Sequence, residues 1–205
     1  MSVATVSVLA DAWGRPARRS TAWVRDAALV AGFVALTAVG AQVRIALPFT
    51  PVPITGQTFA VLLAGAVLGA GRGAASQAAY WIVGMVGVPV YADAQAGWAV
   101  ATGPTMGYLA GFVVAAWVVG RLAERRHDRR FVTAAPAMLL GTAAIYACGV
   151  AWLAVSLGVP ILGGAPDAVE LGLTPFLAGD AVKLLLAAAA TSGTWRLIGA
   201  ARDSR

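Results

Sequence analysis

Long apolar stretches recur along this chain and are separated by short polar connections. Most are close to the length, about 20 residues, at which an α-helix crosses the hydrocarbon core of a bilayer. The second stretch is shorter, so we expect it to be tilted, buried by its neighbours or extended into Pro53 and Ile54. The pattern predicts an all-α, polytopic membrane protein with six transmembrane helices, over residues 27–46, 57–70, 73–90, 105–122, 134–158 and 176–198.

Basic residues fall on alternate connections between these stretches. They precede the first stretch, separate the second from the third and the fourth from the fifth, and follow the last, with Arg44 and Lys183 as the exceptions. This alternation follows the positive-inside rule for six spans with both termini in the cytoplasm. We therefore expect a cytoplasmic N-terminal segment (1–26), poorly ordered or lying on the surface, a six-helix domain (27–198) and a cytoplasmic tail (199–205).

Composition supports a membrane environment. The chain is 60% hydrophobic and only 12% charged, whereas about a quarter of the residues in a soluble domain are charged. The net charge of +6 does not indicate nucleic-acid binding, because the arginines lie in short connections between long apolar stretches. The single Cys148 excludes an intrachain disulfide and a cysteine-rich metal site, and we interpret it as a small buried hydrophobic residue.

Familiar catalytic motifs are missing. The sequence contains no Gly-x-x-x-x-Gly-Lys phosphate-binding loop and no His-Glu-x-x-His zinc motif, and His127 is its only histidine. We therefore expect no catalytic residue, no metal site and no bound cofactor. His127 lies in a highly charged connection, which we interpret as a solvated loop that sets topology.

Charge within an apolar span gives the clearest candidate site. Asp180 and Lys183 lie near the outer end of the last predicted helix, where a charged side chain costs at least about 2.5–3.5 kcal/mol. Their i, i+3 spacing places both on one face of the helix. An aspartate accepts hydrogen bonds from ligand N–H groups and a lysine donates to a carbonyl or carboxylate, so the pair suits a small polar ligand. A purely structural ion pair is the alternative.

The first outer connection, residues 47–57, is rich in proline and holds an extended conformation. Several of its residues are apolar although the connection is expected to face water. This favours either a lid that lies across the outer mouth or a connection that packs against the bundle. Thr55 is a candidate N-cap for the second helix. The lid residues are Phe49, Thr50, Val52, Ile54 and Thr55.

Aromatic residues follow in and after the second outer connection. Tyr91, Trp98 and Tyr108 offer flat faces with a polar edge, which suit either a ligand ring or the membrane interface.

In the first helix, Ala27, Ala31 and Ala35 form a stripe of small residues that lets helices approach closely. That stripe could face a partner subunit or the protein's own bundle.

Several of these motifs, in this order, resemble the BioY family, the biotin-specific substrate-binding (S) components of energy-coupling factor (ECF) transporters. The resemblance covers roughly residues 27–198. It is carried by Pro-Val-Pro-Ile-Thr-x-Gln at 51–57, Gly-x-x-Gly-x-Pro-Val-Tyr at 84–91, Gly-Pro-Thr-x-Gly-Tyr at 103–108 and Gly-Asp-x-x-Lys at 179–183.

The resemblance implies a six-helix S-component fold in a prokaryotic plasma membrane and biotin bound at the outer face. It implies a transmembrane coupling protein and cytoplasmic ATPases as partners, with the alanine stripe as the docking face. It also implies that Asp180 and Lys183 are the polar ligand-binding pair and that loop 47–57 closes over the site. From position and chemistry, we add as expected ligand contacts Gln57, Tyr91, Trp98 and Tyr108.

The chemistry of biotin agrees with this site, because its ureido ring has two N–H donors and one acceptor and its tail ends in a carboxylate. Whether Lys183 meets the ureido oxygen or the carboxylate stays open at this point. The rival interpretations are an S component for another vitamin, a biotin carrier that works without an ATPase, a structural membrane protein, and a membrane-embedded enzyme.

Overall fold

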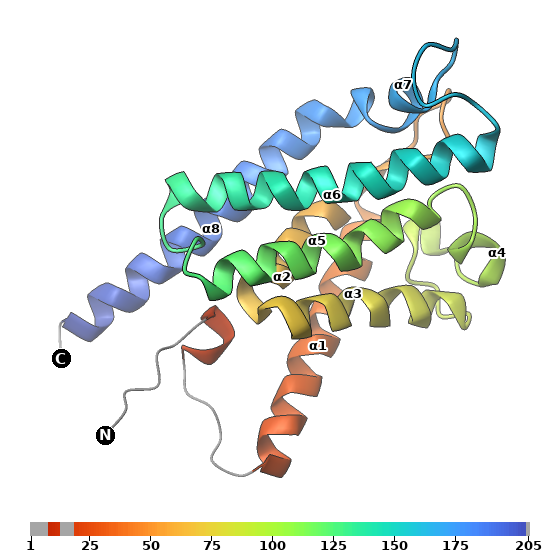
Figure 1. Cartoon of the computed structure of the whole chain (residues 1–205). Helices are drawn as coiled ribbons and strands as arrows, with labels where there is room; N and C mark the ends of the chain where they lie inside the picture. The colour runs from red at the N-terminus through yellow and green to blue at the C-terminus, as the bar shows by residue number, and fades with distance from the viewer. Residues whose placement is uncertain (1–7, 13–18, 204–205) are drawn as a thin grey trace.

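Six long helices account for the six apolar stretches. The computed structural model describes residues 8–12 and 19–203, and its long helices confirm the all-α prediction (Figure 1). Of the described helices, four are long and apolar enough to cross a membrane alone, within 20–42, 106–124, 131–157 and 168–200. The long helices are α1 (Arg19–Gln42), α2 (Gln57–Leu68), α3 (Ala70–Met85), α5 (Met106–Glu124), α6 (Phe131–Leu157) and α8 (Leu177–Asp203).

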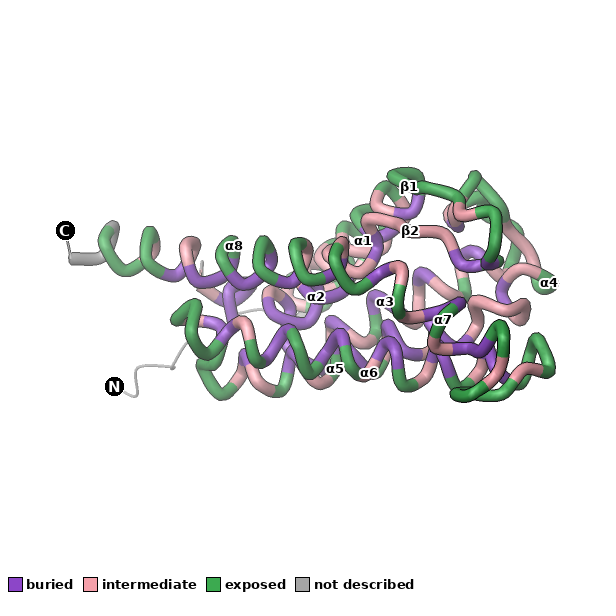
Figure 2. The backbone as a smooth tube through the Cα atoms, turned by 90° about the horizontal axis from the view of Figure 1, so that it is seen from above, coloured by how far each residue is buried: buried purple, intermediate pink, exposed green. Residues whose placement is uncertain are grey.

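Short elements gather mostly at one end of the bundle, which we call the hairpin end (Figure 2). There β1 (Arg44–Ile45) and β2 (Ile54–Thr55) pair antiparallel, with Arg44 opposite Thr55. The second connection forms η2 (Ala92–Ala94) and α4 (Trp98–Ala101), and the last connection forms α7 (Ala168–Gly172) and η3 (Thr174–Phe176). Only η1 (Leu9–Asp11) lies elsewhere among the described short elements.

Helix α2 has 12 residues and is about 18 Å long at about 1.5 Å per residue, so it is short of a bilayer core of about 30 Å. Most of its residues are buried, and it contacts α1, α3, α5 and α8. Burial by neighbours is therefore how this short helix is accommodated. Its expected extension into Pro53 and Ile54 is wrong, because Ile54 belongs to β2 instead.

A single residue, Gly69, separates α2 from α3. Its φ of 84° lies in the left-handed region, where glycine has no Cβ to clash, so the chain reverses within one residue. The first amide of α3, Ala70 N, donates to Glu124 Oε1 of α5 at 2.9 Å. Gly65 lets α5 approach closely, since a Cβ there would lie 2.6 Å from Ala116 O.

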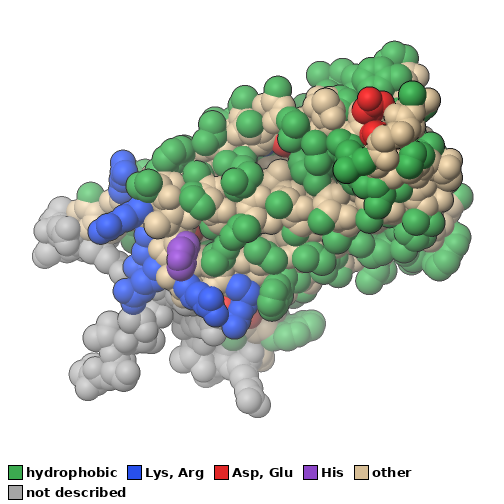
Figure 3. Space-filling model, turned by 45° about the horizontal axis from the view of Figure 1, so that its top comes forward, with side chains coloured by type: hydrophobic (Ala, Val, Ile, Leu, Met, Phe, Trp, Pro, Cys, Tyr) green, Lys and Arg blue, Asp and Glu red, His purple; other side chains and the backbone are tan. Residues whose placement is uncertain are grey.

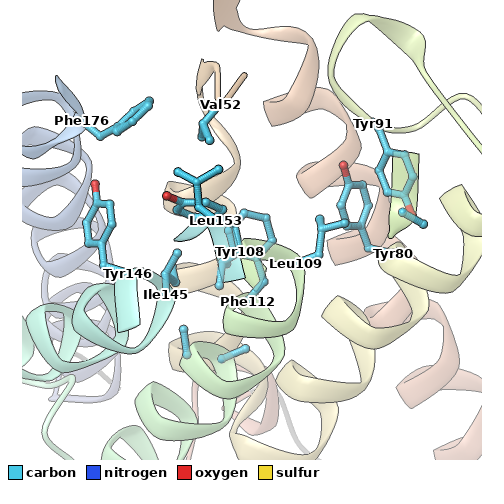
Figure 4. Packing of buried hydrophobic residues seen from close by; sticks show 14 of the residues in the cluster. Val52, Tyr80, Tyr91, Tyr108, Leu109, Phe112, Ile145, Tyr146, Leu153 and Phe176 are labelled. Carbon is cyan, nitrogen blue, oxygen red and sulfur yellow. The ribbon is translucent and has the colours of Figure 1, made fainter. Parts of the chain in front are cut away.

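The core of the hairpin end is rich in aromatic residues. Tyr80, Tyr91, Tyr108, Phe112 and Tyr146 belong to one buried cluster there (Figure 4). A second cluster, from α2, α5, α6 and α8, is aliphatic and includes Leu62, Val119, Met138 and Leu184. Large aromatic side chains with hydroxyl groups thus concentrate where polar partners are available.

At the opposite end, basic side chains gather on the surface (Figure 3); they come from the α5–α6 connection and from Arg196 of α8, and we call this the basic end. Residues 8–12 pack there against Leu68 and Ala123. Val8, Leu9 and Ala10 are buried, so the expectation of a poorly ordered or surface-lying segment is wrong for these residues, which bury apolar side chains. The same expectation for residues 1–7 and 13–18 lies outside the described residues.

Helix boundaries also differ from the expected ones at both termini. Helix α1 begins at Arg19, within the segment expected before the first span, and α8 continues to Asp203, within the expected tail. Arg72 anchors the start of the chain, since its guanidinium donates to both carboxylate oxygens of Asp11 at 3.1 Å and to Asp26 Oδ1 at 2.8 Å. These ion pairs attach Asp11, and the start of α1 at Asp26, to α3.

Candidate ligand-binding site

A cavity of about 420 Å³ opens at the hairpin end, a size typical of small-ligand sites. Its wall combines the first two connections with α2, α5, α6 and α8, so segments far apart in sequence meet there. The side chains discussed below that line it are Arg44, Thr50, Val52, Thr55, Gln57, Thr58, Tyr91, Asp93, Tyr108, Phe112, Tyr146, Phe176, Asp180 and Lys183.

Asp180 is the centre of a hydrogen-bond network in the wall of this cavity. Its Oδ1 accepts from Lys183 Nζ at 2.7 Å and from Thr58 Oγ1 at 3.0 Å. Its Oδ2 accepts from the Tyr146 hydroxyl at 2.6 Å. The Asp180 side chain is only 8% exposed, and these donors compensate the loss of water around its charge.

Local structure explains the placement of the pair. Asp180 lies in the first turn of α8, where the positive end of the helix dipole favours a carboxylate. Lys183 follows three residues later on the same face, as the spacing predicted. The structure therefore brings Asp180 and Lys183 together at one cavity.

Gln57 links the cavity to a second polar chain. Its Nε2 donates to the Tyr80 hydroxyl at 2.8 Å, which in turn donates to Val90 O at 3.0 Å. Thr55 donates to Gln57 Oε1 at 3.0 Å. The N-cap residue of α2 is Gly56 rather than Thr55, so that expectation is wrong, because Thr55 lies in β2 and directs its hydroxyl toward Gln57.

Two of the expected aromatic contacts, Tyr91 and Tyr108, line the cavity. The Tyr91 hydroxyl donates to Trp81 O at 2.5 Å, and burial raises the pKa of Tyr91 to about 12, so the group stays protonated. The Tyr108 hydroxyl donates to Gly172 O at 2.7 Å. With their hydroxyls held by backbone carbonyls, both residues offer the cavity mainly the apolar part of their rings.

Trp98 does not lie at the cavity. It begins α4, and 68% of the residue is exposed on the outside of the second connection. The expectation that Trp98 lines the site therefore fails, and the neighbouring Ala99 and Val100 line the cavity instead. The reason is the helical turn of α4, which directs successive side chains in different directions.

The proline-rich connection lies over the cavity, with Val52 directed into the molecule above Tyr108 (Figure 4). Thr50, Val52 and Thr55 line the cavity, and the Thr50 hydroxyl accepts from Val52 N at 3.3 Å. Phe49 is exposed, and Ile54 packs against the core beside the cavity. Only part of the predicted lid therefore faces the site.

Sequence reasoning missed four polar side chains of this end. Thr58 and Tyr146 bind Asp180, and Arg44 pairs with Asp93 across the two connections at 2.7 Å. Thr58 follows the Pro-Val-Pro-Ile-Thr-x-Gln motif directly, and Arg44 is the one basic residue on a connection otherwise without basic charge, so both carried a signal. Tyr146 lies in the middle of an apolar span and carried none.

The alanine stripe of α1 lies away from the cavity. Ala27, Ala31 and Ala35 are exposed on the face of α1 turned away from the bundle. An added Cβ at the nearby Gly32 would meet nothing within 4 Å. Of the two interpretations, the structure excludes packing of this stripe within its own bundle, because these residues have no described neighbour helix over them.

Comparison with known proteins gives one consistent result. A family model described as the BioY family matches residues 11–200. A probable biotin transporter BioY from Pyrococcus horikoshii is 40% identical over 159 residues, which cover 78% of this chain and 89% of the relative. A biotin transporter BioY from Thermotoga maritima is 39% identical over 156 residues, which cover 76% of this chain and 87% of the relative.

One solved structure has the same fold. It is the S-component for biotin from an ECF-type ABC transporter, with a TM-score of 0.77 and 23% sequence identity. The match covers 88% of this chain and 95% of the other. The expected S-component bundle is thus confirmed as the fold.

Proposed function

This chain belongs to the BioY family, and from that premise we propose that it binds biotin in the hairpin-end cavity as the substrate-binding component of an ECF-type transporter. The observation that carries the proposal is the Asp180 network, a buried and hydrogen-bonded carboxylate in the wall of a cavity that also has aromatic and aliphatic lining. Relatives named as biotin transporters, 40% and 39% identical, support the ligand.

The network has unused capacity for a ligand. A carboxylate has about four lone-pair sites, and three donors among the described residues bind Asp180. Lys183 has three N–H donors, of which one is bound to Asp180. Asp180 therefore accepts from a ureido N–H, and Lys183 donates to the ureido oxygen beside it. Phe112, Tyr108 and Phe176 supply apolar surface for the sulfur-containing ring.

The orientation follows from the distribution of charge. The basic end holds the arginines of the α5–α6 connection and of α8, so the positive-inside rule places it in the cytoplasm. Both termini are then cytoplasmic in a multi-pass protein of a prokaryotic plasma membrane. The hairpin end, with the cavity, faces outward, where a vitamin is captured.

Delivery across the membrane needs partners that this chain does not contain. The exposed small residues of α1, centred on Ala31, suit close docking of a transmembrane coupling protein. Cytoplasmic ATPases bound to that protein supply the energy. In this proposal the chain itself acts by binding its ligand and carrying it within the assembly.

Equilibrium binding tests the ligand. Purified protein in detergent, freed of any co-purified ligand, is titrated with biotin, riboflavin and thiamine in a calorimeter. We expect tight one-to-one binding of biotin alone. Selective binding of another vitamin, or no binding by folded protein, would overturn the proposal.

Vesicle uptake tests the need for partners. Labelled biotin is offered to proteoliposomes that contain this chain alone or with a coupling protein and ATPases. We expect concentrative uptake only with the complete assembly and ATP. Equal uptake by the chain alone would instead establish a carrier independent of ATP.

A further inference from the structure

Four charged side chains line the cavity, and the proposed ureido contacts use only two of them. Arg44 of β1 and Asp93 of η2 form an ion pair of 2.7 Å that joins the first connection to the second. Side-chain exposure rises from 8% for Asp180 and 19% for Lys183 to 32% for Arg44. The cavity thus has a buried polar pair and a second, wetter pair nearer solvent.

We propose that Arg44 determines specificity for a negatively charged ligand tail, and that it binds the tail carboxylate in exchange for Asp93. This inference rests on the proposed function, since it assigns the other end of the biotin molecule. Of the two partners left open for Lys183, the ureido oxygen and the tail carboxylate, the proposal assigns it the ureido oxygen.

Electrostatic balance supports the exchange. Arg44, Asp93, Asp180 and Lys183 together have no net charge, so a ligand carboxylate adds one negative charge that needs a cation. Lys183 is poorly suited, because its counterion Asp180 is buried and cannot move into water without leaving Tyr146 and Thr58. Asp93 is 52% exposed, so its carboxylate can return to water at little cost.

The chemistry of arginine suits this role. A guanidinium presents paired N–H donors that match a carboxylate in a bidentate arrangement. Arg44 lies opposite Thr55 in the hairpin, and Thr55 both lines the cavity and donates to Gln57. A ligand carboxylate that enters from the outer mouth would therefore meet the Arg44 guanidinium, which is paired with Asp93 when no ligand is bound.

Opening the ion pair need not release the second connection, because Gln42, the last residue of α1, also binds it. Its Nε2 donates to Tyr91 O at 3.0 Å, and its Oε1 accepts from Ala94 N at 3.2 Å. The cavity wall can therefore stay in place while Arg44 changes partner. Asp93 can turn away as a side chain without moving its backbone.

Paired titrations of biotin and biotinamide test the inference, because the two differ only at the end of the tail, which is a charged carboxylate in one and a neutral amide in the other. We expect the wild-type protein to bind biotin at least about 10-fold more tightly, as for a charge-assisted hydrogen bond. Arg44→Gln should remove most of this preference, because it lowers the affinity for biotin and leaves the affinity for biotinamide nearly unchanged. Asp93→Asn should raise the affinity for biotin a few-fold, because Arg44 then has no competing carboxylate, and should leave the affinity for biotinamide unchanged.

Arg121→Gln, at the basic end, is the matched control and should change neither affinity. If Arg44→Gln is poorly folded, Asp93→Asn and Arg44→Lys still test the inference, since Lys should keep part of the preference. A preference that survives in Arg44→Gln, or that collapses only in Lys183→Gln, overturns it. Failure of wild-type protein to bind either compound would instead contradict the proposed function itself.

Discussion

The two ends of this bundle use the same chemistry for different purposes. At the hairpin end Asp180 pairs with Lys183, and at the basic end Asp11 pairs with Arg72; both aspartates are buried. At the hairpin end the space beside the pair is a cavity. At the basic end Val8 and Ala10 instead pack into a buried cluster with Leu68 of α2 and Ala123 of α5.

The difference shows what makes an ion pair a candidate site. Both oxygens of Asp11 accept from Arg72, and Arg25 forms a second ion pair with Asp11 at 3.5 Å. Asp180 has comparable burial but faces open volume, next to a lysine with donors to spare. An intramembrane charge therefore indicates function when space and hydrogen-bonding capacity accompany it.

The largest effect should follow removal of the charge on Asp180. We expect Asp180→Asn to weaken biotin binding about 100-fold or more, because hydrogen bonds to a charged group contribute about 1.5–3 kcal/mol each. Calorimetric titration measures the loss. Asp26→Asn, the same change at the basic end, should leave the affinity as it is, and equal losses in both variants would contradict the comparison.

Next in size is the effect of Arg72→Gln at the basic end. Removing the guanidinium takes away the shorter, two-oxygen contact of the buried Asp11 carboxylate and leaves its ion pair with Arg25 at 3.5 Å, so we expect the unfolding free energy to fall by about 2 kcal/mol. Thermal unfolding in detergent should show a lower midpoint, while biotin affinity stays within about twofold. A large loss of affinity at unchanged stability would mean that the two ends are coupled rather than independent.

A smaller effect is expected for Tyr146→Phe. This change removes one hydrogen bond of 2.6 Å to Asp180 and keeps the ring, so biotin affinity should fall about 10-fold. Tyr108→Phe is a useful contrast, since its hydroxyl binds Gly172 O and should matter more for stability than for affinity. The reverse ranking in titration and thermal unfolding would assign the polar contact to Tyr108.

The smallest effect is expected for Trp98→Ala. The side chain is exposed and lies outside the cavity lining, so biotin affinity should be unchanged. Titration of this variant beside wild type measures it. A loss of 10-fold or more would restore the expectation drawn from the sequence and show that the second connection folds over the bound ligand.

Much of the architecture was predictable because its signals are local. The length and spacing of the apolar stretches predicted six long helices, and all six are found, with boundaries within four residues except at the start of α1 and the ends of α3 and α8. Asp180 and Lys183 stood out because charge is rare in such stretches. The Pro-rich connection predicted a cover for the site, and three of its five named residues line the cavity.

The sequence by itself determined the number of long helices and the charged pair, together with the pattern of basic residues from which we propose the orientation. These depend on the cost of placing polar groups in lipid, which acts on each segment separately. Only the tertiary structure decided that Tyr146 and Thr58 reach Asp180, that Arg44 meets Asp93, and that Trp98 points away. These contacts depend on the angles at which the helices cross and on their rotation about their own axes. The spacing of residues within a single segment does not encode either.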